Sequence, residues 1–341
     1  MENKIIVILG PNASGKSELA VKLAKKFNGE IISADSRQVY KGLDIGSGKV
    51  PRDRPNKKRI KTNNKRIFDK NSISFERDSS EYLYRGIPHH LLDVASPKRV
   101  FTVAQYQKLA KKALKDILKR GKIPIICGGT GFYIDALIYD YQFPKVPPQP
   151  KLRKELEKKT TEELFAQLQK LDPERAKNID KNNRRRLIRA LEIVITTHKP
   201  VPTLNDISVN QRSNQRESAA ALAVLKIGIK KSPEELKKLI KKRLLKRLKM
   251  GLIDEVRRLH YQQGLSWQRL DDLGLEYRYV SRYLRDLITK KEMVKILERE
   301  IYRYAKRQMT WFKRDKEIYW INPRTKKGFQ RIIKICKKFL Y

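Results

Sequence analysis

The chain has 341 residues, which is enough for a sizeable hydrophobic core and for two domains. Its 79 Lys and Arg residues against 37 Asp and Glu give a formal net charge of +42, which points to a polyanionic partner such as nucleic acid, although a lysine-rich proteome would produce the same excess. Two cysteines without neighbours at metal-ligand spacing argue against a disulfide scaffold and a zinc site. With no signal peptide and no membrane-spanning apolar run, we expect a cytoplasmic protein.

An apolar run at residues 4–9, β-branched at four of its six positions, predicts a buried strand. The motif G-x-x-x-x-G-K-S follows and leads into a helical pattern, which is the context of a phosphate-binding loop. Its glycines let successive N–H groups converge on an anion at the positive end of the helix. We expect Lys16 to bridge phosphate oxygens and Ser17 to offer its hydroxyl to Mg²⁺. The expected phosphate-binding residues are Gly10, Pro11, Asn12, Ala13, Ser14, Gly15, Lys16 and Ser17.

Two further apolar runs predict strands that end beside this loop. Residues 30–34 lead into Asp35, and residues 122–127 lead into a Gly-Gly-Thr-Gly turn that contains Thr130. Ligands of open α/β sheets bind at the carboxyl ends of the strands, so Asp35 is expected to face the same crevice as the phosphate loop. Neither strand is followed by the sequence pattern that an ordinary ATPase has downstream of its phosphate loop.

The pattern of the whole chain predicts an α/β fold with a P-loop NTPase-like parallel sheet, a helical insertion domain and a helical C-terminal region. Residues 1–140 form the first part of the core, with a basic loop insertion at 50–77 in which 52–70 hold nine Lys or Arg. A proline cluster then introduces a helical domain at 141–199. Residues 200–341 return to the core through a final strand at 219–229 and continue as basic helices. The basic insertion is either a nucleic-acid contact or a solvated charge run.

Basic clusters occur at two helical positions. Residues 184–189 hold four arginines at a helix start, which suits phosphate contacts. The helix at 301–314 interleaves basic residues with aromatic ones, a pattern typical of proteins that stack single-stranded or flipped bases.

Seven motifs in this order resemble the tRNA dimethylallyltransferase family, also called the isopentenyl-tRNA transferases, over nearly the whole chain. They are 10–17, 35–40, 44–46, 86–93 (GIPHHLLD), 128–133 (GGTGFY), 186–192 (RLIRALE) and 305–311 (AKRQMTW).

The resemblance implies transfer of a dimethylallyl group from dimethylallyl diphosphate to the exocyclic N6 amine of the adenosine 3′ of the anticodon. The phosphate loop would then hold a diphosphate leaving group, with Mg²⁺ as cofactor. By position, Asp35 matches the general base, Arg243 the arginine that holds the diphosphate, and Thr130 a threonine of the reaction channel. With Lys16 these are the expected catalytic residues.

The resemblance also implies a tRNA-binding surface on a monomer. The chain departs from the family pattern in the basic insertion, in Leu239 where an arginine is common, and in a Gly-Leu-Glu-Tyr-Arg segment at 274–278. The tRNA-binding residues carried over are Asp35, Ser36, Arg37, Gln38, Thr130, Arg153, Arg185, Arg186, Leu187, Ile188, Arg189, Gly274, Leu275, Glu276, Tyr277 and Arg278.

Three other functions share some of these features. A P-loop nucleoside kinase would consume ATP and would not need the positive charge. An adenylate isopentenyltransferase would act on free nucleotide and would lack the helical insertion and the basic C-terminal helices. A nucleic-acid-binding NTPase switch would bind RNA and transfer nothing.

Overall fold

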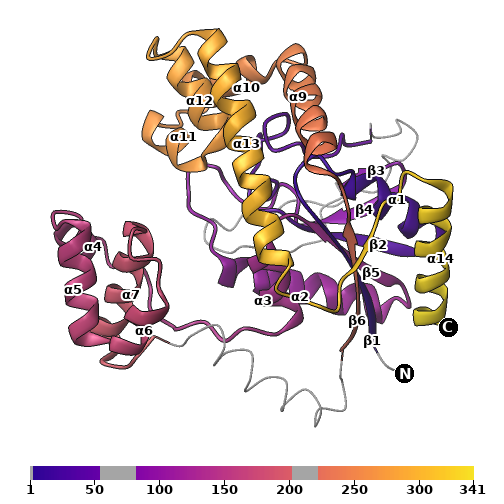
Figure 1. Ribbon diagram of the computed structural model, residues 1–341, viewed down its shortest axis with the longest axis horizontal. Helices are drawn as coiled ribbons and strands as arrows, with labels where there is room; N and C mark the ends of the chain where they lie inside the picture. The colour runs from indigo at the N-terminus through magenta and orange to yellow at the C-terminus, as the bar shows by residue number, and fades with distance from the viewer. Residues whose placement is uncertain (1–2, 54–81, 202–221) are drawn as a thin grey trace, which may run out of the picture. The chain divides into compact units, whose positions relative to one another are not determined.

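The computed structural model describes residues 3–53, 82–201 and 222–341. The chain divides into two compact units, one made of residues 1–138 and 222–341 and the other of residues 139–221. Figure 1 shows an α/β unit and an all-helical unit. The helical unit begins within two residues of the boundary expected at 140/141. Most of the basic insertion at 52–70 lies outside the described residues.

The α/β unit is built on a seven-stranded sheet in the order β3-β4-β2-β5-β1-β6-β7. Strand β1 lies inside it, parallel to β5 and β6, and β2 lies parallel to β4 and β5. Only the short β3 runs antiparallel to its neighbour among the described strands. The bounds are β1 Asn3–Leu9, β2 Gly29–Ala34, β3 Leu83–Tyr84, β4 Ile87–His90, β5 Ile123–Gly128, β6 Leu222–Ile229 and β7 Tyr319–Ile321. The predicted parallel P-loop-like core is therefore confirmed.

Strand β7 corrects the expectation that β6 is the final strand. It pairs in parallel with β6 at Ile227–Tyr319, Gly228–Trp320 and Ile229–Ile321. Three residues are too few for an apolar period to stand out, so the partner strand and not the local sequence determines this edge of the sheet.

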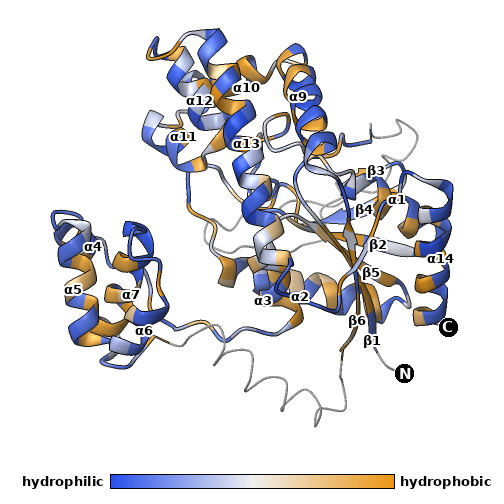
Figure 2. Cartoon of the chain, viewed as in Figure 1, coloured by the Kyte–Doolittle hydropathy of each residue, from blue (hydrophilic) through white to orange (hydrophobic). Residues whose placement is uncertain are grey.

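Helices cover both faces of the sheet and bury its apolar side chains. Helix α1 (Lys16–Lys26) contributes the apolar face that includes Leu19 and Leu23, and α2 (Val103–Lys119) begins with a capping box at Thr102 and Gln105. Helix α3 (Gly131–Ile138) follows the turn after β5. Figure 2 shows hydrophobic residues along the sheet and hydrophilic residues over much of the outer helices. The strands read as continuous apolar runs because both faces are covered.

The C-terminal half of this unit is helical. Helix α9 is capped by Ser232 with Pro233 in its first turn, and its Leu245 side chain is 42% exposed. The helices are α9 Pro233–Lys249, α10 Leu252–Tyr261, α11 Trp267–Leu273, α12 Leu275–Leu284, α13 Lys290–Phe312 and α14 Lys326–Leu340. Among the helices that the structure describes, none is both long and apolar enough to cross a membrane.

The second unit has its own core. Its helices are α4 Pro150–Leu156, α5 Thr161–Leu171, α6 Pro173–Asn178 and α7 Arg184–Thr197. Leu164, Leu168, Leu187 and Leu191 pack together with no exposed surface. Because α5, α6 and α7 start at side-chain caps on Thr160, Asp172 and Asn183, each helix boundary is encoded locally.

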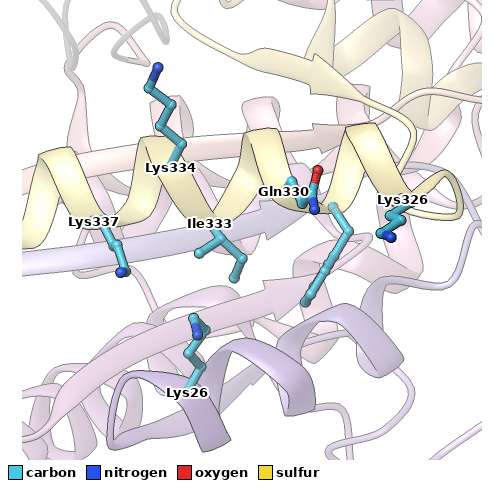
Figure 3. Close-up of a pocket in the computed structure, with 7 residues that line it drawn as sticks. Lys26, Lys326, Gln330, Ile333, Lys334 and Lys337 are labelled. Carbon is cyan, nitrogen blue, oxygen red and sulfur yellow. The ribbon is translucent and has the colours of Figure 1, made fainter.

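A groove of about 590 Å³ lies between α1 and α14. Figure 3 shows Lys26 on α1 facing Ile333 on α14, with Lys326, Lys334 and Lys337 along the second helix. Residues of the phosphate loop take no part in its lining, so this groove is separate from the pocket described next.

Candidate functional site

A pocket of about 210 Å³ lies at the carboxyl ends of β1, β2 and β5. The parallel strands bring the phosphate loop, the turn after β2 and the glycine turn after β5 to one edge of the sheet. Helix α9, from the C-terminal part of the chain, adds the side chain of Arg243. The lining residues are Asn12, Ala13, Ser14, Gly15, Lys16, Ser17, Glu18, Asp35, Gln38, Ser47, Gly48, Cys127, Gly128, Gly129 and Arg243. Six of the eight expected loop residues are among them, and Gly10 and Pro11 lie buried behind.

The phosphate loop has the curled backbone that its glycines predict. Gly10 and Gly15 have φ angles of 144° and 99°, and Ala13 has a φ of 63°, in the left-handed region that L-residues rarely adopt. Gly15 forms the N-cap of α1, so the N-terminal N–H groups of this 11-residue helix face the pocket. An anion placed there would meet the positive end of the helix dipole.

Two cationic side chains, Lys16 and Arg243, point into this pocket from different elements. The Lys16 ammonium donates to the Pro11 carbonyl at 2.8 Å, within the loop. Burial is the main cause that lowers the pKa of Lys16, to about 8, and the neighbouring Arg243 lowers it further. Burial likewise lowers the pKa of Arg243. Both shifts identify a pocket that disfavours its own positive charges until an anion compensates them.

Asp35 lies at the end of β2 in an Asx-type turn. Its Oδ1 accepts the backbone N–H groups of Arg37 at 2.9 Å and Gln38 at 3.4 Å, which fixes the carboxylate toward the pocket. Gln38 is itself held by the Ser33 hydroxyl at 3.0 Å and donates to the Gly48 carbonyl at 3.3 Å. The sequence prediction that Asp35 and the phosphate loop share one crevice is therefore correct.

Thr130 joins the turn after β5 to the turn after β2. Its hydroxyl accepts the Ser36 N–H at 3.1 Å, and its own N–H donates to the Ala34 carbonyl at 3.1 Å. Thr130 thus borders Asp35, although its side chain is not part of the pocket lining.

Gln308 is a site residue that the sequence reasoning did not single out. Its side chain is 5% exposed, accepts the Asn12 N–H at 2.8 Å and donates to the Gly129 carbonyl at 2.8 Å. It therefore ties the phosphate loop to the glycine turn, although Gln308 lies 296 residues after Asn12 in the sequence. The AKRQMTW motif contains it, but nothing local in that motif distinguishes a buried clamp from an exposed glutamine.

Trp311, expected among the stacking aromatics of the last helix, points inward. Its Nε1 donates to Asp135 at 2.8 Å, and its ring lies so close to Gly131 that a Cβ there would come within 2.2 Å of the ring. This aromatic therefore packs against the glycine turn.

The segment at 274–278 contains both buried and part-exposed side chains. Glu276 and Tyr277 are 5% and 2% exposed and contact residues beside the pocket. Gly274 and Leu275 start α12 with φ angles of 75° and 41°, and the Arg278 Nε donates to the Asp271 carbonyl at 2.9 Å. As the structure has them, Glu276 and Tyr277 offer almost no surface to RNA.

The remaining expected tRNA-binding residues belong to the helical unit. Arg185 and Arg186 are exposed at the start of α7, whereas Leu187 and Ile188 are buried in the core of that unit. Arg153 and Arg189 form ion pairs with Glu192, which has no exposed surface. Burial alone would raise the pKa of Glu192, but the hydrogen bonds from Arg153, the Gln149 N–H and Arg189 hold it at about 2.

The pocket has oxygen donors but no metal cluster of its own. Within the described ranges, no group of three or more His, Cys, Asp or Glu side chains is arranged to hold a metal ion. The hydroxyl of Ser17 lines this pocket beside the phosphate loop. A single protein oxygen there fits Mg²⁺, which keeps several waters and takes further ligands from substrate phosphates.

Two family models match this chain. The IPP transferase model matches residues 67–315, and the isopentenyl transferase model matches residues 3–77. A curated tRNA dimethylallyltransferase of Anoxybacillus flavithermus is 39% identical over 97% of this chain and 94% of its own length. That of Acetivibrio thermocellus is 38% identical over 100% of this chain and 98% of its own length.

Solved structures agree with the sequence matches. The tRNA Δ(2)-isopentenylpyrophosphate transferase of Staphylococcus epidermidis has a TM-score of 0.63 at 34% identity and covers 99% of both chains. A eukaryotic dimethylallyltransferase acting on tRNA has a TM-score of 0.71 at 25% identity over 99% of this chain and 80% of its own.

Proposed function

Because this chain belongs to the IPP transferase family, we propose that it is a tRNA dimethylallyltransferase. It transfers a dimethylallyl group from dimethylallyl diphosphate to the N6 amine of the adenosine 3′ of the anticodon and releases diphosphate. The observation that carries this proposal is the shared pocket in which the phosphate loop, Arg243 and Asp35 meet. Such a pocket combines a site for an anionic leaving group with a carboxylate that can take a proton.

Diphosphate recognition is assigned to the phosphate loop, Lys16 and Arg243. Negative charge grows on the bridging oxygen as the carbon–oxygen bond breaks, so cations fixed at that oxygen stabilise the transition state more than the ground state. The lowered pKa of Lys16 supports this role, since a pocket that disfavours free cations gains most from binding an anion.

Amine activation is assigned to Asp35. An adenine amine is a poor nucleophile because its lone pair is delocalised into the ring, so the enzyme must orient it and accept its proton. The two backbone N–H groups on Oδ1 hold the carboxylate in place, and the other oxygen, Oδ2, is the one we assign as the base. The adenine must leave its stack to reach this carboxylate, which costs less from a single-stranded loop.

The Mg²⁺ ion that we propose as cofactor would be held by the Ser17 hydroxyl and the diphosphate oxygens. When bound, it would supply further positive charge to the leaving group. Lys16, Arg243 and the phosphate loop line the same pocket and would supply positive charge to the same leaving group.

The tRNA substrate is proposed to contact the exposed arginines of α7, Arg185 and Arg186, and the turn at 35–38. Arg153 and Arg189 can combine a phosphate contact with their ion pairs to Glu192, because 37% and 38% of their side-chain surfaces are exposed. The enzyme is proposed to act as a monomer in the cytoplasm.

The test is incubation of the protein with dimethylallyl diphosphate and an anticodon stem-loop RNA, followed by mass analysis of the nucleosides. Dimethylallyl adenosine in the RNA, formed without ATP, is the expected product. Modification of free AMP instead of RNA would assign the chain to the adenylate isopentenyltransferases. ATP hydrolysis or phosphate transfer would assign it to the nucleoside kinases or NTPase switches.

A further inference from the structure

One wall of the pocket is a loop whose shape depends on residues far away in the sequence. Ser47 and Gly48 line the pocket. Just before them, the N–H groups of Asp44, Ile45 and Gly46 donate to the carboxylate of Glu255 at 3.0, 2.7 and 3.0 Å. A carboxylate that is 1% exposed therefore fixes three successive backbone groups of the loop.

Tyr277 holds the next residue of this loop. Its hydroxyl accepts the Ser47 N–H at 3.0 Å and donates to Glu255 Oε1 at 3.0 Å. The tyrosine ring packs on Gly46 so tightly that a Cβ on this glycine would lie 2.7 Å from the ring. Burial raises the pKa of Tyr277 well above its usual value, so the hydroxyl keeps the proton that it donates to Glu255.

Glu276 acts on the same wall through an arginine. It accepts a hydrogen bond from Arg247 Nη1 at 2.5 Å. The guanidinium of Arg247 lies under Gly48, where a Cβ would come within 1.9 Å of Nη2. Glu276 and Tyr277, which are adjacent on α12, thus both support this loop. Glu276 does so through Arg247, and Tyr277 through hydrogen bonds to Ser47 and Glu255.

We propose that Tyr277 and Glu255 are positioning residues for the pocket, which hold Ser47 and Gly48 in the shape that binds the diphosphate substrate. This inference rests on the proposed function. The segment at 274–278 then acts on the reaction from inside the protein: the polar atoms of Tyr277 are engaged by the loop, and its side chain offers almost no surface to tRNA. The sequence resemblance had assigned this segment to tRNA contact.

The experiment compares Tyr277→Phe, Glu255→Gln and the double variant with the wild type. Dimethylallyl diphosphate affinity is measured by calorimetry, anticodon stem-loop affinity by filter binding, and folding by thermal denaturation. Each single variant is expected to weaken dimethylallyl diphosphate binding by about 5- to 100-fold, because a loop that relaxes to relieve the unpaired group must return to the binding shape at the expense of binding free energy. RNA affinity should stay within about twofold. The double variant should lose less than the product of the two single effects, since both variants disrupt the same hydrogen-bond network around the loop.

Two further variants separate positioning from a loss of stability. Tyr261→Phe removes the same hydroxyl from a tyrosine that is 66% exposed on α10, and should change neither affinity. Gly46→Ala forces a Cβ toward the Tyr277 ring from the loop side and should reproduce the weaker diphosphate binding.

The outcomes distinguish this inference from the proposed function. A wild type that does not bind dimethylallyl diphosphate refutes the proposed function. A wild type that binds it, with folded Tyr277→Phe and Glu255→Gln variants that bind equally well, overturns the positioning role. Loss of RNA affinity at unchanged diphosphate affinity would also overturn it and return Tyr277 to the tRNA interface.

Discussion

The pH dependence of diphosphate binding gives a direct measure of the role of Lys16. Burial lowers the pKa of this lysine from 10.5 to about 8, so its charge is lost as the pH rises through 8. If only the charged form binds, the apparent affinity follows the protonated fraction, which falls about 10-fold between pH 7 and pH 9. The ligand adds no opposite trend, because the last ionisation of a phosphate ester is near pH 6.

Calorimetry with dimethylallyl diphosphate from pH 6.5 to 9.5 measures this loss. Lys16→Met should bind weakly with little pH dependence, because the titrating group is gone. Lys16→Arg keeps a charge that does not titrate in this range, so its affinity should also vary little with pH. A wild-type affinity that stays constant to pH 9, or a Lys16→Arg variant with the same decline as the wild type, would refute the reasoning.

Two other substitutions test contacts that organise the units. Gln308→Leu should lower dimethylallyl diphosphate affinity by about 5- to 100-fold, because it leaves the Asn12 N–H and the Gly129 carbonyl unpaired, whereas the adjacent Met309→Leu should have little effect; equal affinities for both variants would refute the clamp. Glu192→Gln should cost about 1–3 kcal/mol of unfolding free energy at pH 7, a range that allows for the partial exposure of its two arginine partners. The cost should be smaller at pH 3, since the wild type loses the same stabilisation as the Glu192 carboxylate protonates between pH 4.5 and about 2. Urea unfolding of the full chain at both pH values measures this, and an equal loss at pH 3 would contradict the ionic origin.

The sequence predicted those parts of the site that short stretches encode. The loop at 10–17 and the Asx turn at Asp35 are local, and each follows an apolar run that can be recognised as a strand, so their meeting at one sheet edge follows from parallel topology. Arg243 was predicted from the family resemblance, and the structure places its side chain in the lining of the pocket. The bounds of the predicted strands were also close, because β1, β2, β5 and β6 are mostly buried on both faces.

The parts of the site and fold that the sequence did not predict depend on tertiary contacts between distant residues. Glu255 binds a loop about 210 residues earlier, and Gln308 clamps a loop 296 residues earlier, so no spacing in the sequence relates them to the pocket. Strand β7 exists because β6 offers it an edge. The resemblance assigned Tyr277 to tRNA contact, and the sequence pattern placed Trp311 among stacking aromatics. Only their contacts with Gly46 and Gly131 show that both rings support loops.

The central claim is that Asp35 accepts the proton of the attacking adenine amine, and single-turnover transfer by Asp35→Asn tests it most directly. Asn has nearly the same shape and can still accept a hydrogen bond, so the affinities for dimethylallyl diphosphate and RNA should remain close to wild type. The transfer rate at saturation should fall by about 10²- to 10⁴-fold and should not recover across a Mg²⁺ series. A near-normal rate would contradict the base role of Asp35. A rate restored by added Mg²⁺ would also contradict it and would identify Asp35 as a metal-binding residue.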